Sequence, residues 1–230
     1  MPSALIRLRA AVADAASLRA WTVDANDGII ATAGVLEGFA GAGASDSTLL
    51  TAAIVATVAG ALSLGGAKWS EAAAERDAQL RVAREEAAQL ELSPAEEMLE
   101  LAGYYESKGL STDLARLVAE QLTATDALGA QLETEHGIRE VMSRAAPVWA
   151  GVSASLAFVL GALVPLLITL LVPSQVEAWA VLFAVAASLV LTSIVSARTG
   201  RTGVLRTVAR SLTVGIGTLG VSYLAGLLIF

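Results

Sequence analysis

Apolar residues along this chain fall into long unbroken blocks. The blocks cover residues 20–45, 48–69, 147–172, 176–197 and 212–230. Each block has about the 20 residues that a membrane-spanning helix needs. The pattern therefore predicts an all-α integral membrane protein with five transmembrane helices.

One long polar stretch, residues 71–144, separates the second apolar block from the third. No Pro or Gly interrupts residues 67–92, so we expect the second helix to continue straight out of the membrane. The rest of the stretch predicts three or four short helices packed as a small bundle. This acidic helical domain would be inserted between transmembrane helices 2 and 3.

Helix start and stop signals divide the polar stretch. Ser93 followed by Glu96 is a capping box, and Pro94 occupies the first helical position. The expected helix starts are Ser93, Ser111 or Thr112, and Thr125, and the expected ends are Gly109 and Gly137. The core of this bundle is expected to contain Leu99, Leu101, Leu114, Leu117 and Leu122, with Tyr104 and Tyr105.

Composition agrees with a membrane protein. The 230 residues are 55% hydrophobic and 16% charged, with a mean hydropathy of +0.66, which lies outside the range of soluble domains. Residues 1–19 have no apolar core of a signal peptide, and they are expected to form an amphipathic lead-in. The expected division is therefore this lead-in, a transmembrane hairpin at 20–70, the polar domain at 71–144 and transmembrane helices 3 to 5 at 145–230.

Negative charge is concentrated in the polar stretch, which has sixteen acids and seven bases although the whole chain carries only −7. An acidic domain repels phosphate, so nucleic-acid binding is disfavoured. Basic residues outside it, at Arg7, Arg9, Arg19 and 198–210, fall on the same side of the predicted membrane. The two opposite connections, near Asp46 and Glu177, have none. By the positive-inside rule, the N-terminus and the acidic domain are expected in the cytoplasm and Phe230 on the far side.

Three ionisable side chains of the first predicted hairpin are candidates for a position inside the membrane, namely Asp27, Glu37 and Lys68. Charges inside a membrane are costly and mark candidate transport pathways. Glu37 lies roughly 14 Å deep and Asp27 about 30 Å from the outer turn, at 1.5 Å per residue. Lys68 is at a depth where it is placed to pair with Asp27. The structural alternatives are an interfacial carboxylate for Asp27 and a packing residue with internal hydrogen bonds for Glu37.

A second group of candidate residues lies in the acidic domain. Its members are Glu86, Glu97, Glu100, Glu133, Glu135 and His136. Glu97 and Glu100 are three residues apart on one helix and share a face. Carboxylates that converge from several helices with a His bind divalent iron or manganese in helical bundles. The alternative is a solvated acidic face.

Other motifs carry no chemistry. Gly215, Gly217 and Gly220 match the spacing of a dinucleotide-binding loop, but they lie in an apolar block and predict close helix packing instead. The chain has no Cys, and no hydrolase, kinase or redox motif is present. We therefore expect neither an enzyme nor a bound cofactor.

The order of short motifs along the chain resembles the vacuolar iron transporter family. These motifs are Asn26-Asp27-Gly28, Ala59-Gly60-Ala61-Leu62-Ser63-Leu64-Gly65, Ser93-Pro94-Ala95-Glu96-Glu97, residues 101–114, and Glu135-His136-Gly137-Ile138. Together with the five predicted spans and the acidic insert, the resemblance covers almost the whole chain.

The resemblance implies a homodimer that exchanges divalent iron, with manganese as a second ion, for protons. It implies that Asn26 and Asp27 lie on a pathway formed by the first two transmembrane helices at the dimer interface. It also implies that Glu86, Glu97, Glu100 and Glu135 bind metal in the cytoplasmic domain, with Glu133 and His136 in reserve. The substrate would be a divalent ion such as Fe²⁺, Mn²⁺ or Zn²⁺.

Several positions depart from the family pattern. In the pathway, Ala56 and Lys68 replace carboxylates and Leu64 replaces a methionine. In the acidic domain, Gln89 replaces a glutamate, and Gln131 and Leu132 stand where methionines can occur. By residue count Glu37 is level with Ala56 on the neighbouring helix, which suggests that Glu37 supplies the missing carboxylate.

Two functions are compatible with these features. The first is export of Fe²⁺ or Mn²⁺ from the cytoplasm by proton antiport, after collection of the metal by the acidic domain. The second is a metal sensor or scaffold of the same fold that does not transport. A prokaryotic plasma membrane is the expected location.

Overall fold

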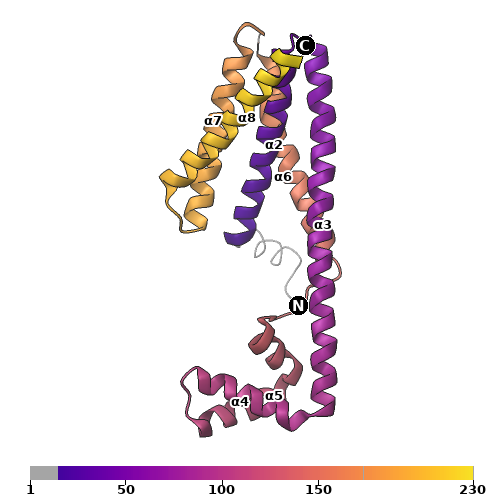
Figure 1. Ribbon diagram of the computed structural model, residues 1–230, viewed down its shortest axis with the longest axis vertical. Coiled ribbons are helices and arrows are strands. Elements are labelled where there is room, and N and C mark those ends of the chain that lie inside the picture. Colours follow the sequence, from indigo (N-terminus) through magenta and orange to yellow (C-terminus); the bar gives the residue numbers. More distant parts are fainter. Residues whose placement is uncertain (1–14, 173, 230) are drawn as a thin grey trace. The chain divides into compact units, whose positions relative to one another are not determined.

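The computed structural model describes residues 15–172 and 174–229, all of whose regular elements are α-helices. These are α2 (Ala15–Gly41), α3 (Asp46–Leu92), α4 (Pro94–Ser107), α5 (Thr112–His136), α6 (Ala146–Leu171), α7 (Ser174–Thr199) and α8 (Val204–Ile229) (Figure 1). Arg7 and Arg9 of the expected lead-in lie outside the described residues, as does Phe230. Residues 15–19 of that lead-in belong to α2.

Four helices in the described part of the chain are long and apolar enough to cross a membrane. They are α3, α6, α7 from Trp179 and α8 up to Leu228. The protein is thus an all-α membrane protein, and a fifth span formed by α2 stays a prediction. Helix α2 contains Arg19, Asp24, Asp27 and Glu37, which make it more polar than α6, α7 and α8.

The boundaries of two helices show how far the apolar pattern reaches. Helix α3 is one element of 47 residues, as the absence of Pro and Gly after position 67 predicted. Helix α8 begins at Val204, eight residues before the last apolar block. Arg206 and Arg210 therefore lie on the first turns of a helix and not in a connection.

The chain divides into two compact units, Met1–Trp69 with Trp149–Phe230, and Ser70–Val148. In the first unit α2 packs against α7 and α8. The core there consists of Ile29, Ala33, Val181, Val185, Leu189 and Leu219. The α7 members of this core are four residues apart, so one apolar stripe of α7 faces α2.

Glycines allow α2 and α6 to touch through their backbones. A Cβ on Gly28 would lie 2.0 Å from the carbonyl oxygen of Phe158, and one on Gly161 would lie 1.9 Å from that of Ala25. Close packing is confirmed for Gly215, where a Cβ would meet Leu189 at 2.3 Å. A Cβ on Gly217 or Gly220 would meet nothing within 4 Å among the described residues of this chain, so close packing at these two glycines stays a prediction. Those two glycines face away from the helices that pack on α8.

In the second unit α4 packs on α5 around Leu101, Ala102 and Ala119. Leu122 and Tyr105 pack against this core, as expected. The prediction was wrong for Leu99, Leu114 and Leu117, which are 50% or more exposed. Ala115 and Ala119, four residues apart, form the buried stripe of α5, and this turns Leu114 and Leu117 away from α4.

The helix signals were right for α4 and one residue off within α5. Helix α4 begins at Pro94, although Ser93 makes no side-chain capping bond. Asp126, and not Thr125, starts the final helical segment, because its φ and ψ of −159° and 85° break the helix there. Its Oδ1 accepts a hydrogen bond from the Gly129 amide at 2.9 Å. The Thr125 hydroxyl instead donates to the Gln121 carbonyl one turn earlier.

Candidate metal centre

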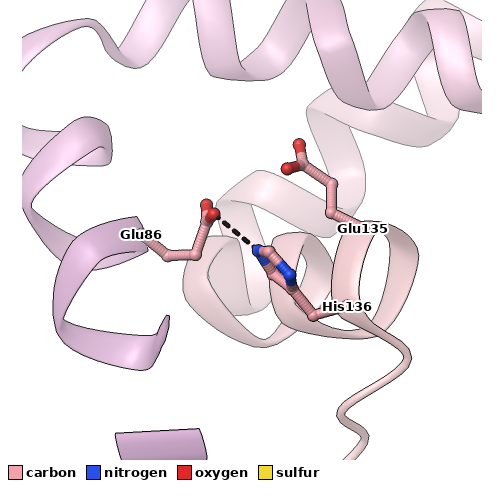
Figure 2. Close-up of side chains that lie close together, drawn as sticks. All are labelled: Glu86, Glu135 and His136. Carbon is pink, nitrogen blue, oxygen red and sulfur yellow. Dashed lines mark hydrogen bonds and ion pairs between the residues drawn. The ribbon is translucent and has the colours of Figure 1, made fainter. Parts of the chain in front are cut away.

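Three helices of the second unit bring acidic side chains together. Glu86 comes from the final turns of α3, Glu97 and Glu100 from the first turns of α4, and Glu135 and His136 from the end of α5. One ligand atom from each of Glu86, Glu135 and His136 lies within 4.8 Å of the other two (Figure 2). The same holds for Glu97, Glu100 and Glu135. Glu135 is thus common to two overlapping groups, and we call these five residues the carboxylate cluster.

Glu133 is the one predicted residue of the acidic domain that the structure does not bring into this cluster. Its side chain is 57% exposed and accepts a hydrogen bond from Arg139 Nε at 3.1 Å. Two residues along a helix correspond to a rotation of about 200°. Glu133 and Glu135 therefore point in nearly opposite directions from α5.

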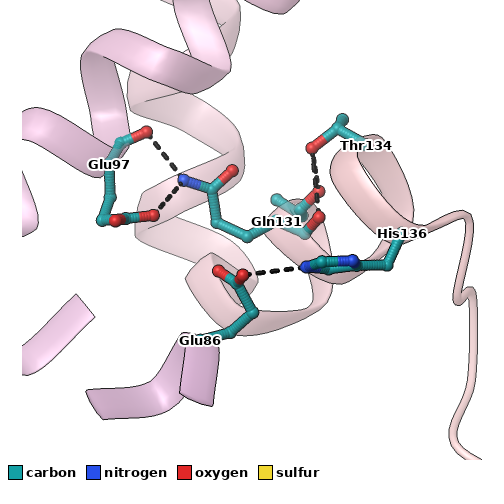
Figure 3. A network of polar contacts seen from close by, with 6 residues as sticks. Glu86, Glu97, Gln131, Thr134 and His136 are labelled. Atoms are coloured by element: carbon teal, nitrogen blue, oxygen red, sulfur yellow. Dashed lines mark hydrogen bonds and ion pairs between the residues drawn. The ribbon is translucent and has the colours of Figure 1, made fainter. Parts of the chain in front are cut away.

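Two members of the carboxylate cluster are buried, and each contacts a side chain of α5, either an amide or an imidazole. Glu86 is 4% exposed and Glu97 is 6% exposed. Gln131 Nε2 donates to Glu97 Oε2 at 2.9 Å and to the Glu97 carbonyl at 2.7 Å (Figure 3). His136 Nε2 lies 2.9 Å from Glu86 Oε1. Glu86 Oε2 and Gln131 Oε1 are buried and have no hydrogen-bond partner among the described residues.

The sequence marked Gln131 only as a departure from the family pattern and did not predict its contact with Glu97. A signal for it existed, because Gln131 precedes Glu135 by four residues and so lies on the same face of α5. Its burial, at 2% exposed, depends on packing against α4 and has no local signature in the sequence.

Crowded negative charge sets the electrostatics of the cluster. Burial raises the pKa of Glu97, the carboxylates of Glu100 and Glu86 raise it further, and the hydrogen bond from Gln131 lowers it. Burial also raises the pKa of Glu135, again with contributions from neighbouring carboxylates, while His136 lowers it. Both shifts mean that the ionised cluster is destabilised first by burial and then by repulsion between its own carboxylates. A bound cation would relieve this repulsion.

The predicted pathway residues lie in the first unit. Asp27 is exposed on α2, and the Lys68 ammonium attracts it electrostatically, as it does Asp24. Asp24, only 8% exposed, was missed by sequence reasoning, although it lies three residues before Asp27 and so near the same helix face. Glu37 is partly buried.

Hydroxyl and amide groups also join α2 to its neighbours. Asn26 Oδ1 accepts a hydrogen bond from Thr192 Oγ1 of α7 at 2.5 Å. The hydroxyls of Thr32 and Thr57 lie 3.1 Å apart in a buried contact between α2 and α3. Polar groups inside a membrane bundle need such partners because lipid offers none.

Comparison with known proteins decides the family. The sequence profile of the VIT family matches residues 18–227, which include both the membrane helices and the acidic domain. The chain belongs to the VIT family. The resemblance seen in the short motifs is thereby confirmed.

Two relatives illustrate how this VIT family member compares with longer proteins. It is 35% identical over 156 residues to the vacuolar iron transporter of Acanthamoeba castellanii, an alignment covering 68% of this chain and 56% of that protein. It is 29% identical over 160 residues to vacuolar iron transporter 2 of Oryza sativa subsp. japonica, covering 69% and 65%. The chain thus spans just over half the length of the first relative and just under two thirds of the length of the second. Both are eukaryotic proteins with vacuolar names, which lends no support to the expected prokaryotic plasma membrane.

Proposed function

We propose that this protein exports divalent iron from the cytoplasm by proton antiport, with manganese as a second ion. The observation that carries the proposal is the convergence of Glu86, Glu97, Glu100, Glu135 and His136 in a member of the VIT family. Two relatives have names that say iron transporter. Carboxylates that converge from several helices beside a His suit Fe²⁺ and Mn²⁺.

In this proposal the acidic domain collects metal on the cytoplasmic side. Its ligands bind either a proton or a metal ion, since a carboxylate must lose its proton to coordinate. Raised pKa values at Glu97 and Glu135 strengthen this competition. The metal is the substrate, and the cluster would concentrate it before transport.

The membrane pathway is proposed to run along the first two transmembrane helices at a homodimer interface, with α2 as the fifth span. Asn26 and Asp27 would stand at its cytoplasmic end with Lys68, and Glu37 would supply a carboxylate at mid-depth. Attraction between Lys68 and the Asp24 and Asp27 carboxylates supports the arrangement at the inner end, because each aspartate offsets a charge that would repel a cation.

Uptake by reconstituted vesicles tests transport directly. Full-length protein would be placed in proteoliposomes that contain a metal-sensitive dye, and Fe²⁺, Mn²⁺, Co²⁺ or Zn²⁺ would be added under a proton gradient. We expect uptake of Fe²⁺ and Mn²⁺ that collapses with the gradient. The variant Glu97→Gln should slow uptake at low metal concentration, whereas the matched variant Glu133→Gln should not. Absence of uptake for all four ions would refute transport.

The role of Glu37 needs its own variant. Glu37→Gln keeps the size of the side chain and removes its charge, so we expect slower metal uptake and a changed dependence on pH. If both stay as in the unsubstituted protein, Glu37 is a packing residue and does not replace the family carboxylate.

A metal sensor or scaffold that does not transport is the second candidate. Lys68 favours this second function, since a fixed positive charge at that position opposes the entry of a cation. The same vesicles separate the two functions. Binding of Mn²⁺ by the full-length protein without uptake, restored neither by a gradient nor by Lys68→Gln, would support the sensor.

A further inference from the structure

Each buried carboxylate of the cluster has one of its two oxygens occupied by a neighbouring side chain. In Glu86 the oxygen is Oε1, 2.9 Å from His136 Nε2. In Glu97 it is Oε2, which accepts a hydrogen bond from Gln131 Nε2 at 2.9 Å. Figure 3 shows the two contacts side by side, with the donors from α5 and the acceptors from α3 and α4.

The remaining oxygen of Glu86 has the properties of a ligand atom. Glu86 Oε2 is buried and has no partner in the part of the chain that the structure describes, and the side chain is 4% exposed. A buried carboxylate oxygen without a hydrogen bond is costly. A cation held between Glu86 and Glu135, which face each other in Figure 2, would satisfy it.

Occupied oxygens limit how a metal can bind. A hydrogen bond to the second oxygen of a carboxylate favours coordination through the first oxygen alone, because it holds the second oxygen toward the donor. Chelation through both oxygens of Glu97 would turn Oε2 toward the metal and away from the Gln131 amide that donates to it. Gln131 is only 2% exposed. That amide would then keep a buried N–H without a partner.

We propose that Gln131 and His136 are specificity-determining positioning residues that hold Glu97 and Glu86 as single-oxygen ligands. Small transition ions such as Fe²⁺ and Mn²⁺ accept six single donors in octahedral geometry. Ca²⁺ takes six to eight oxygens at 2.3–2.6 Å and commonly chelates carboxylates through both oxygens. The two hydrogen bonds therefore select transition ions against Ca²⁺. This inference rests on metal binding by the carboxylate cluster, as proposed above, but not on transport.

The test compares Mn²⁺ and Ca²⁺ affinities of the full-length protein in detergent, measured by titration calorimetry. The variant Gln131→Met keeps the length of the side chain and removes the donor, and Gln131→Leu removes the donor without adding the thioether that the family can have at this position. Partners that orient a ligand are worth about 10- to 100-fold in metal affinity. We expect Gln131→Met to weaken Mn²⁺ binding by about that factor while Ca²⁺ binding holds or improves, so the preference for Mn²⁺ falls about tenfold or more.

Matched variants separate positioning from structure. Gln121→Met makes the same substitution at an exposed position of α5 and should change neither affinity. His136→Leu should lower the preference for Mn²⁺ in the way that Gln131→Met does. His136→Gln keeps a donor of similar reach and should restore the preference. Thermal unfolding of each variant without metal shows whether it folds.

Infrared spectra of the carboxylate stretches give a readout that affinity alone does not. With Ca²⁺, Gln131→Met should show the narrower splitting of a two-oxygen carboxylate, and the unsubstituted protein should not.

Equal loss of Mn²⁺ and Ca²⁺ affinity in Gln131→Met, or no loss, would overturn the inference. Nitrogen coupling to bound Mn²⁺ in electron spin echo spectra that disappears in His136→Gln would make His136 a direct ligand and overturn its part. No Mn²⁺ binding by the unsubstituted protein would refute the cluster as a metal site, whereas binding without uptake would refute only transport.

Discussion

Replacing Gly161 with alanine tests whether backbone contact between α2 and α6 holds the membrane helices together. The added Cβ would lie 1.9 Å from the Ala25 carbonyl oxygen, and real Cβ atoms essentially never come within 3.0 Å. The helices must therefore separate locally by about 1 Å, which forfeits a quarter to a half of the dispersion energy of each contact there. Forced overpacking of this kind costs about 1–3 kcal/mol.

The shift would also reach the proposed pathway, because Asn26 follows Ala25 on α2 and is bonded to Thr192. We expect a lower thermal unfolding midpoint for Gly161→Ala in detergent, together with slower metal uptake in vesicles. The control is Gly217→Ala, whose Cβ meets nothing within 4 Å and whose helix gains about 1 kcal/mol in propensity. Equal stability of the two variants would refute the α2–α6 contact as a source of stability.

Three further predictions concern the acidic domain. Asp126→Ala should destabilise it by about 0.5–2 kcal/mol through loss of a helix cap, whereas Thr125→Ala should cost less; hydrogen exchange at the end of α5 measures both, and the reverse order would contradict the cap. Because the pKa values of Glu97 and Glu135 are raised above 4.5, the native state binds more protons than the unfolded state between 4.5 and the raised values. Stability without metal should therefore increase as pH falls through that window, and thermal unfolding that shows a decrease there would oppose this sign. Mn²⁺ at 100 times its Kd should add about 2.7 kcal/mol, and a chelator should remove that gain; unchanged unfolding would exclude native-state binding.

Much of the fold follows from patterns that a sequence displays locally. Apolar blocks locate α6 and α7 to within two residues, and the absence of Pro and Gly after position 67 predicts the full length of α3. The start of α8 was missed because residues 204–211 form an amphipathic turn with Arg206 and Arg210. Helical hydrogen bonding continues through such a turn, whereas a search for apolar runs ends at it.

The candidate site was less accessible to sequence reasoning. The spacing of Glu97 and Glu100 shows that they share a face, but nothing in the sequence brings Glu86 and Glu135, 49 residues apart, to the same point. That expectation came from the analogy with metal-binding helical bundles and from the family resemblance. Gln131 was noted only as a departure from the family pattern, because an amide becomes part of a metal site only through the carboxylate it orients. Its partner, Glu97, is on another helix.

The distribution of basic residues in the acidic domain supports the proposal that the carboxylate cluster binds a cation. Arg139 pairs with Glu133, and Arg116 pairs with Glu120, both at exposed positions. Arg76 donates to the Met142 carbonyl, and Lys108 lies over the Tyr104 ring. In the described residues, the ion pairs reach the cluster only through His136. Burying carboxylates without a permanent cation costs free energy, so the compensating charge must come from protons or from a metal ion. A structural cluster would be expected to use an arginine, whereas one that exchanges its cation cannot.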